Sequence, residues 1–378
     1  MVVVKDRIMG SGKTYEAIQW MKETDEKFVY ITPFLSEVDR VLSEVDAYKP
    51  LRTSVDSGKK NGLLNLMSYS LNVVSTHACF KMLNRHDYND SFKDYVLVLD
   101  EVVEPIEILN LSRNDIDLLV STNTIKINED NSVDFIYEDY NGKFNYLKEL
   151  CNTSNVFLVS DTFLVWNFPV EIFKSFKRVE ILTYIFEGSI LSSYFKLNNI
   201  EYVLDKKDDS SDKEKIKNLL NIYDGSSNSI GDKKTSLSVN WFQCNKKELK
   251  KLSFITTNVF TRKFKTKSDF NSFTTFKDYS SQLKGAGYSK GFIPVNSRAT
   301  NNYADKKSLA YLANRYYSPT ITQFFGYSNI EMNQDLWALS ELLQWVWRGC
   351  IRKGEPMNLY VPSKRMRDLL VLWLDNKL

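Results

Sequence analysis

Continuous apolar runs alternate with segments of helical periodicity over the first 165 residues. Such runs, without polar alternation, are typical of strands that are covered on both faces. Strands that alternate with helices predict a parallel α/β sheet, which binds ligands at the carboxyl ends of its strands. Residues 14–21 have the spacing of a helix. The runs expected to form strands are Val2–Val4, Phe28–Ile31, Asn72–Ser75, Val96–Leu99 and Val156–Val159.

The segment 124–146 has a different pattern, with Ile125–Ile127 and Asp134–Tyr137 as two short apolar stretches. This pattern predicts a small hairpin inserted on the first sheet.

A second α/β unit is expected to begin near Lys177, with a strand at Val179–Thr183 and a helix that runs through Tyr194. Further along, 336–351 is a strongly periodic helix, 359–361 a last strand and 366–374 a closing helix. We therefore predict two α/β domains with parallel sheets flanked by helices. Their expected bounds are 1–170 and 171–378, with an insertion in the second domain around 205–275.

Composition narrows the class of protein. The chain has 378 residues, of which 43% are hydrophobic, and its formal net charge of +3 requires any basic surface to be local. The absence of a long apolar run excludes a membrane-spanning helix, and Met1–Asp6 is too short an apolar start for a signal peptide. Four scattered cysteines and two histidines exclude a zinc site of usual spacing and a disulfide scaffold. We expect a chain in a reducing, cytoplasmic compartment.

A glycine-rich turn follows the first strand and precedes the first helix. It reads Met9-Gly10-Ser11-Gly12-Lys13-Thr14, which matches the end of the P-loop pattern G-x-x-x-x-G-K-[ST]. The predicted phosphate-binding residues are Gly10, Ser11, Gly12, Lys13 and Thr14. Lys13 would reach the β- and γ-phosphates, and the Thr14 hydroxyl would ligate Mg²⁺. Arg7 stands at the place of the first glycine, and a turn without chemical function is the alternative.

Two carboxylates end a predicted buried strand at Asp100 and Glu101. Beside a phosphate loop, Asp100 could hold Mg²⁺ and Glu101 could orient or deprotonate the attacking water. Two exposed turn acids after a core strand are the alternative.

The periodic helix near the end of the chain has Gln344, Arg348 and Arg352 at spacings of four residues. If the helix runs through all three, they share one stripe and could line a phosphate site. We predict catalytic roles for these three residues together with Lys13 and Glu101. A solvated polar face is the alternative.

A local basic stretch spans residues 246–267, where cations and phenylalanines interleave. We predict that it follows the phosphates of a nucleic acid and stacks its bases, chiefly through Lys250, Lys251, Arg262 and Lys263. A solvated, lysine-rich helix and loop is the alternative.

Taken together, these motifs resemble those of superfamily 2 helicases of the DEAD/DEAH-box type, and stretches such as LTYIFEG and QWVWRGCIR are similar to small phage-encoded helicase proteins. The resemblance covers nearly the whole chain and implies that both α/β domains are RecA-like P-loop domains. Six segments match family motifs Ia, Ib, II, III, V and VI in order: Tyr30–Leu35, Ser75–His77, Asp100–Val102, Ser160–Thr162, Asn296–Thr300 and Gln344–Arg352. The resemblance also implies nucleic-acid contacts at Pro33, Thr76, Arg298 and Thr300.

Two departures from the family pattern matter. Ile351 holds the place of the second motif VI arginine, so Arg348 is the firmer candidate and Arg352 the weaker. We expect no Q motif before the phosphate loop, so recognition of adenine would come from elsewhere.

The resemblance implies an ATP- and Mg²⁺-dependent helicase or translocase, phage-encoded, that acts in DNA replication or recombination. Its partner would be single-stranded or forked DNA, with RNA possible, and a monomer is favoured. The expected location is then the cytoplasm of an infected bacterial host. A viral DNA-packaging ATPase and a nucleic-acid-binding origin-recognition protein with weak ATPase activity are the alternatives.

Overall fold

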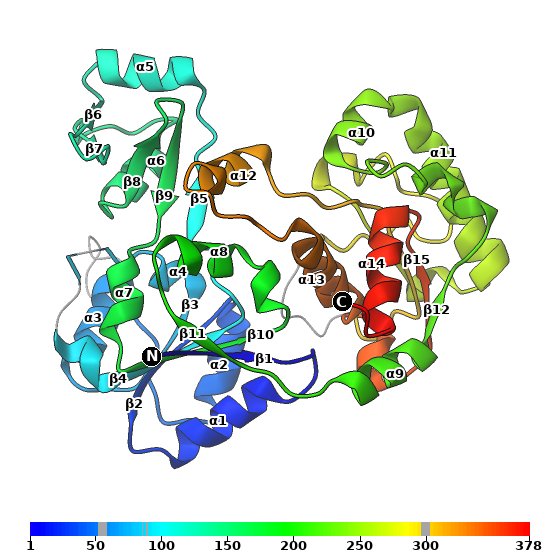
Figure 1. Cartoon of the computed structure of the whole chain (residues 1–378), viewed down its shortest axis with the longest axis horizontal. Coiled ribbons are helices and arrows are strands. Elements are labelled where there is room, and N and C mark those ends of the chain that lie inside the picture. The colour runs from blue at the N-terminus through cyan, green and yellow to red at the C-terminus, as the bar shows by residue number, and fades with distance from the viewer. Residues whose placement is uncertain (52–58, 85, 88–89, 296–302) are drawn as a thin grey trace. The chain divides into compact units, whose positions relative to one another are not determined.

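The computed structural model describes residues 1–51, 59–84, 86–87, 90–295 and 303–378 (Figure 1). They divide into two units. The first unit comprises Met1–Arg7, Gly12–Lys206 and Ser318–Met332, and the second comprises Ile8–Ser11, Lys207–Tyr317 and Asn333–Leu378.

The first unit is built on a parallel sheet of six described strands in the order β11-β1-β10-β4-β2-β3. The strands are β1 (Val2–Asp6), β2 (Lys27–Thr32), β3 (Val73–Thr76), β4 (Tyr95–Asp100), β10 (Arg178–Thr183) and β11 (Tyr202–Asp205). Helices flank this sheet (Figure 1). They are α1 (Lys13–Glu23), α2 (Leu35–Leu42), α3 (Lys59–Ser68), α4 (His77–Phe80), α7 (Val170–Ser175) and α8 (Ile190–Leu197).

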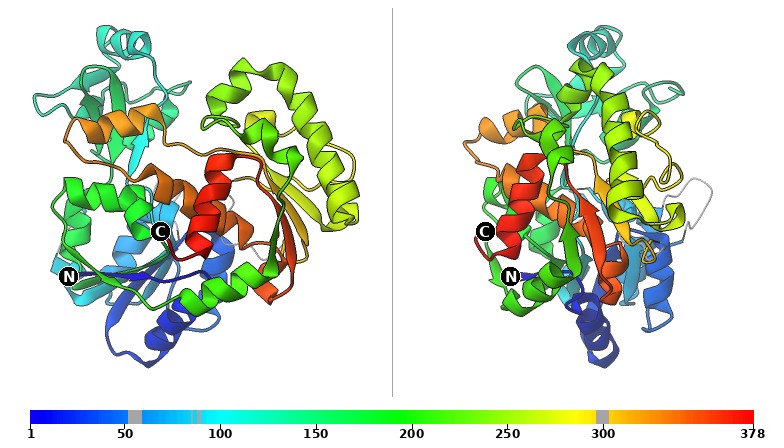
Figure 2. Two further views of the ribbon diagram at one scale, coloured as in Figure 1. Left: turned by 45° about the vertical axis from the view of Figure 1, so that its right-hand side comes forward. Right: turned by 90° about the vertical axis from the view of Figure 1, so that its right-hand side faces the viewer.

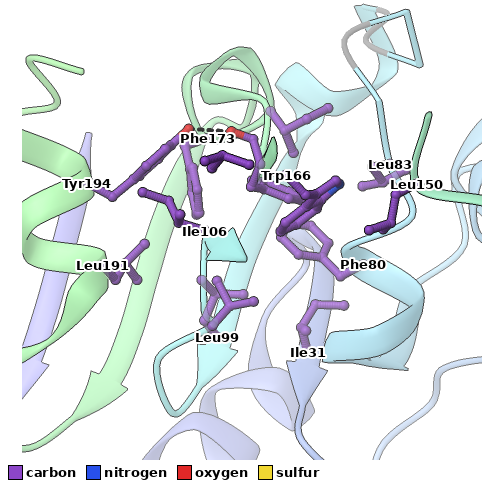
Figure 3. Packing of buried hydrophobic residues seen from close by; sticks show 14 of the residues in the cluster. Ile31, Phe80, Leu83, Leu99, Ile106, Leu150, Trp166, Phe173, Leu191 and Tyr194 are labelled. Atoms are coloured by element: carbon purple, nitrogen blue, oxygen red, sulfur yellow. Dashed lines mark hydrogen bonds between the residues drawn. The ribbon is translucent and has the colours of Figure 1, made fainter. Parts of the chain in front are cut away.

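Both faces of this sheet are buried, which explains the continuous apolar runs. Alternate residues of one strand join different cores: Val96 and Val98 pack with α1 and α2, whereas Leu97 and Leu99 pack on the other face. Figure 3 shows part of this second core, where Leu99 and Ile31 of the sheet lie beneath Phe80 of α4 and Leu191 of α8 lies alongside.

A small antiparallel module lies between β4 and α7 in the sequence. Its three-stranded sheet has the order β5-β9-β8, and a hairpin of β6 and β7 accompanies it, as predicted for 124–146. Val156–Val159 is therefore in an antiparallel sheet, and its prediction as a strand of the main sheet was wrong. The elements are β5 (Ile106–Ile108), α5 (Arg113–Ser121), β6 (Ile125–Ile127), β7 (Val133–Phe135), α6 (Asn145–Cys151), β8 (Val156–Val159) and β9 (Phe163–Asn167).

The second unit contains a parallel sheet of four described strands in the order β12-β15-β14-β13 (Figure 2). Residues of α10, α11 and the π-helix η4 form one apolar core with this sheet. The strands are β12 (Leu220–Ile222), β13 (Asn271–Thr274), β14 (Ser308–Tyr311) and β15 (Met357–Tyr360). The helices are α9 (Ser210–Leu219), α10 (Val239–Cys244), α11 (Lys246–Asn258), η4 (Val259–Phe264), α13 (Gln334–Val346), η7 (Cys350–Lys353) and α14 (Lys364–Leu374).

The predicted domain boundary at 170 was too early. The strand at 178–183 does not open the second unit but pairs with β1 and β4 in the first sheet, and the first unit continues to Lys206. The segment 205–275 is also not an insertion, because β12 and β13 within it belong to the second sheet. A return segment with α12 (Pro319–Gly326) belongs to the first unit, since Phe325 packs in its core.

The predicted fold class is confirmed: both units are α/β, with parallel sheets flanked by helices. Within the described parts of the chain, no helix combines the length and the apolar character that a membrane crossing requires.

Candidate functional site

The glycine-rich turn has the predicted strand–turn–helix context. β1 ends at Asp6, and α1 begins at Lys13. Gly10 and Gly12 have φ angles of 77° and 86°, in the left-handed region where a side chain would be strained. Gly12 is the N-cap of α1, so the backbone N–H groups of the first helical turn follow it directly.

Lys13 lies at the base of this turn. Its Nζ donates a hydrogen bond to the carbonyl of Arg7 at 2.6 Å. Burial lowers the pKa of Lys13 to about 8, while the charges of Asp100, Asp6 and Glu101 act in the opposite direction. The ammonium therefore lies among carboxylates in a place where an anionic ligand would further favour its charged form.

Asp100 ends β4 and meets the first turn of α1. Its Oδ1 accepts a hydrogen bond from the Thr14 hydroxyl at 3.1 Å, and its Oδ2 accepts one from the Tyr30 hydroxyl at 2.7 Å. Burial raises the pKa of Asp100 to about 6, although both hydrogen bonds favour the ionised form. The structure thus brings together Thr14 and Asp100, which the sequence places 86 residues apart.

Glu101 adopts a backbone conformation that is uncommon for its residue type. Its φ is 66°, and its N–H donates to the carbonyl of Leu182 on β10 at 2.9 Å. Left-handed backbone in a residue other than glycine is costly, and it clusters at functional sites. This conformation ends β4 at Asp100, so Asp100 has the extended backbone of a strand whereas Glu101 has a left-handed backbone.

Oxygen atoms suited to a divalent cation converge here. The Thr14 hydroxyl and the Asp100 carboxylate are hard donors, as Mg²⁺ requires, and their separation of 3.1 Å lets both reach one ion. The described residues hold no cluster of three or more His, Cys, Asp or Glu that could bind a metal. The set fits Mg²⁺ in the usual manner, with few protein ligands and the remaining positions taken by water and phosphate.

Two residues contact Asp100 in a way that the sequence did not predict. Tyr30 was expected in a buried strand and at the start of the segment matched to motif Ia, yet its hydroxyl donates a hydrogen bond to Asp100. The signal was a hydroxyl near the carboxyl end of a strand that neighbours β4. His77 contacts the same residue, with Nε2 3.1 Å from the Asp100 carbonyl.

The predicted arginine stripe is wrong in part. α13 ends at Val346, so Gln344 lies on it, whereas Arg348 follows its end and Arg352 lies on η7. Trp347 and Gly349 end the helix, and Gly349 has an extended backbone that breaks the four-residue spacing. Arg348 is buried, and its Nε donates to the Gln344 carbonyl at 3.1 Å, whereas Arg352 is exposed.

The residues predicted to bind nucleic acid have varied surroundings. Pro33 lies between β2 and α2, and the Thr76 hydroxyl caps α4 by accepting from the Cys79 N–H. Arg298 and Thr300 lie outside the described residues. In the basic stretch, Lys250, Lys251, Arg262 and Lys263 are exposed on α11 and η4.

Only one of the three interleaved phenylalanines of this stretch is available for stacking. Phe254 is 65% exposed, whereas Phe260 is buried and Phe264 packs against the core of the second unit. The expected series of stacking rings is thus reduced to Phe254.

The assignment of Ser160–Thr162 to a helicase motif is not supported. These residues form the turn between β8 and β9, where Ser160 and Asp161 both have positive φ. They follow a strand of the antiparallel module, and so do not lie at the carboxyl edge of the six-stranded sheet.

The fold and the site define an α/β protein of two units in which a glycine-rich strand–helix turn meets an acidic strand end. The chain belongs to the YonV family. Residues 214–374 match the YonV C-terminal Rossmann-like domain, and residues 106–166 match the YonV middle domain. The SPbeta prophage-derived uncharacterized protein YonV of Bacillus subtilis (strain 168) is 37% identical over 406 residues, which cover 100% of this chain and 99% of that protein.

Similarity to solved structures is more distant. A structure titled XPD_Helicase has a TM-score of 0.48 and 12% identity, covering 100% of this chain and 94% of its own. S. tokodaii Xpd4 has a TM-score of 0.47 and 10% identity, covering 98% and 93%. Likeness this low does not bear on activity.

Proposed function

We propose that the chain is an ATP- and Mg²⁺-dependent nucleic-acid helicase or translocase. The observation that carries this proposal is the meeting of Thr14 and Asp100 at 3.1 Å beside Lys13 and Glu101. A glycine-rich turn at a helix N-terminus favours phosphate, and an adjacent acidic strand end favours the metal that accompanies it. The proposed phosphate loop is Gly10–Thr14.

The proposed chemistry is phosphoryl transfer to water. Bound Mg²⁺ would neutralise charge on the phosphates, and Thr14 and Asp100 would hold it. Lys13 would leave the Arg7 carbonyl for the phosphate oxygens, and Glu101 would orient or deprotonate the attacking water. Arg348 is the proposed guanidinium for charge on the transferring group, with Gln344 and Arg352 in lesser roles.

The proposed nucleic-acid contact is the exposed basic stretch on α11 and η4, together with Pro33 and Thr76 and the two residues outside the described parts, Arg298 and Thr300. The prophage origin of the Bacillus relative supports a role in phage DNA replication or recombination. Single-stranded or forked DNA is therefore the proposed substrate, with RNA as the rival.

Steady-state ATP hydrolysis tests this function. The rate is measured without nucleic acid, with single-stranded DNA and with RNA of the same sequence. Stimulation by DNA above the basal rate is the expected result. Hydrolysis that no nucleic acid changes, or nucleic-acid binding without any hydrolysis, would contradict the proposal and favour one of the two alternatives.

A further inference from the structure

Arg7 occupies the place where the P-loop pattern has its first glycine. The residue is 8% exposed, and its N–H donates to the Thr183 carbonyl at 3.0 Å, which extends the pairing of β1 with β10 by one residue. Because the φ angle of Arg7 is not positive, a side chain is tolerated at this position without backbone strain. The start of the turn therefore accommodates a long cationic side chain at a position where the P-loop pattern has glycine.

The guanidinium of Arg7 connects two elements. Its Nη1 donates to Glu16 Oε2 at 2.6 Å, and its Nη2 donates to Asp205 Oδ2. Glu16 lies in the first turn of α1, and Asp205 is the last residue of β11. A planar guanidinium that bridges two carboxylates fixes their geometry more closely than an ammonium would.

The backbone of Arg7 is connected to the phosphate-binding residues as well. Its carbonyl accepts the hydrogen bond of Lys13 Nζ at 2.6 Å. A phosphate bound in the glycine-rich turn would compete with this carbonyl for the ammonium. Arg7 is thus linked to the occupancy of the turn through its main chain and to β11 through its side chain.

Both partners of the Arg7–Asp205 pair lie where the chain changes units. The chain leaves the first unit after Arg7 and again after Lys206, one residue beyond Asp205. A second, longer ion pair joins the neighbouring residues, with Lys206 Nζ 3.8 Å from Asp6 Oδ2. Two ion pairs therefore tie the end of β1 to the segment 205–206.

We propose that Arg7 is a positioning residue that transmits occupancy of the glycine-rich turn to the linker segment at residues 205–207, through its ion pairs with Glu16 and Asp205. The inference rests on the proposed binding of ATP in that turn. It goes further by naming the path along which the bound nucleotide acts on the chain between the two units.

Hydrogen exchange of the full-length chain tests this path. Amide exchange over 202–207 is measured with and without the Mg²⁺ complex of a non-hydrolysable ATP analogue, after analogue affinity has been measured. In the wild type, the analogue should change the amide exchange rates over this segment. Asp205→Ala and Glu16→Ala should each remove that change, yet keep analogue affinity within about threefold, because neither carboxylate is among the residues proposed to bind phosphate or Mg²⁺ and partly exposed ion pairs contribute little energy.

The matched control is Asp208→Ala, which removes an exposed carboxylate three residues away that contacts Ser210 and not Arg7. This variant should respond to the analogue as the wild type does. A response that persists in Asp205→Ala, a response that also disappears in Asp208→Ala, or no response in a wild type that binds the analogue would overturn the inference alone. Failure of the wild type to bind the analogue would overturn the proposed function and the inference with it.

Discussion

At the scale of single residues, a substitution at Glu101 should separate the binding of nucleotide from its hydrolysis. In Glu101→Gln the amide fills the same volume but cannot accept a proton. We expect unchanged affinity for ATP and a loss of turnover of at least about a hundredfold, the usual contribution of a general base. Equilibrium binding and single-turnover hydrolysis check this, and an equal loss of affinity would assign Glu101 a structural role instead.

Asp100 should lower the stability of the empty protein at neutral pH. Because its pKa is raised to about 6 in the fold, the folded state binds the proton more tightly than the unfolded chain does. Ionised Asp100 therefore costs stability, and the cost develops as pH rises from about 4 to about 6.

Asp100→Asn removes this cost, since the amide has no charge to desolvate. In EDTA and without nucleotide, the stability of Asp100→Asn relative to the wild type should rise between pH 4.5 and pH 7.5 by on the order of 1–2 kcal/mol. Denaturant unfolding at both pH values measures it, and titrating groups that do not interact with Asp100 contribute equally in the two proteins. Parallel pH profiles would show that Asp100 is not held in a desolvating environment.

At the scale of elements, the sequence predicted well wherever burial was uniform. β2 and β4 lie within a residue of their predicted ends because both faces of the sheet exclude water there. The turn at Gly10–Thr14 was also predicted, since local backbone geometry dictates its glycines.

Predictions that depended on long-range pairing were less successful. Val156–Val159 is as apolar as β4, yet it pairs antiparallel with β9, and no local signal distinguishes the two environments. The same reason misplaced β10, which joins the first sheet although the antiparallel module separates it from β4 in the sequence. The break at Gly349 was missed because apolar periodicity continues through it.

The basic stretch makes a prediction about salt dependence. Neutralising Lys250, Lys251, Arg262 and Lys263 to Gln should weaken single-stranded DNA binding and reduce its logarithmic salt slope by up to roughly 0.7 for each phosphate that is no longer neutralised. Titrations at several salt concentrations measure the slope. A matched control neutralises four lysines that are in surface ion pairs elsewhere, namely Lys196, Lys215, Lys217 and Lys377. An equal change in both variants would place the strand on another surface.

At the scale of the whole molecule, Arg348 is the residue through which the second unit would act on hydrolysis. Arg348→Ala should reduce DNA-stimulated hydrolysis strongly and change nucleotide affinity little, because the proposed role of its guanidinium is to stabilise charge that develops on the transferring phosphoryl group. Arg352→Ala should have the smaller effect, since Arg352 is exposed on η7 and the motif places its arginine one position earlier.

Thermal unfolding of both variants is the necessary control, because Arg348 is buried and its replacement also removes a hydrogen bond to the Gln344 carbonyl. Equal reductions in basal and stimulated rates with a lowered melting temperature would identify Arg348 as structural.

We propose above all that the glycine-rich turn binds and hydrolyses ATP in response to nucleic acid. The most direct measurement compares ATP turnover of the wild type and Lys13→Ala in the presence of single-stranded DNA, with circular dichroism to show that both are folded. Lys13 is only partly buried and makes its described hydrogen bond to a backbone carbonyl, so its removal should leave the fold intact. We predict DNA-stimulated turnover in the wild type and none above background in Lys13→Ala. Near-normal turnover in folded Lys13→Ala would contradict the claim.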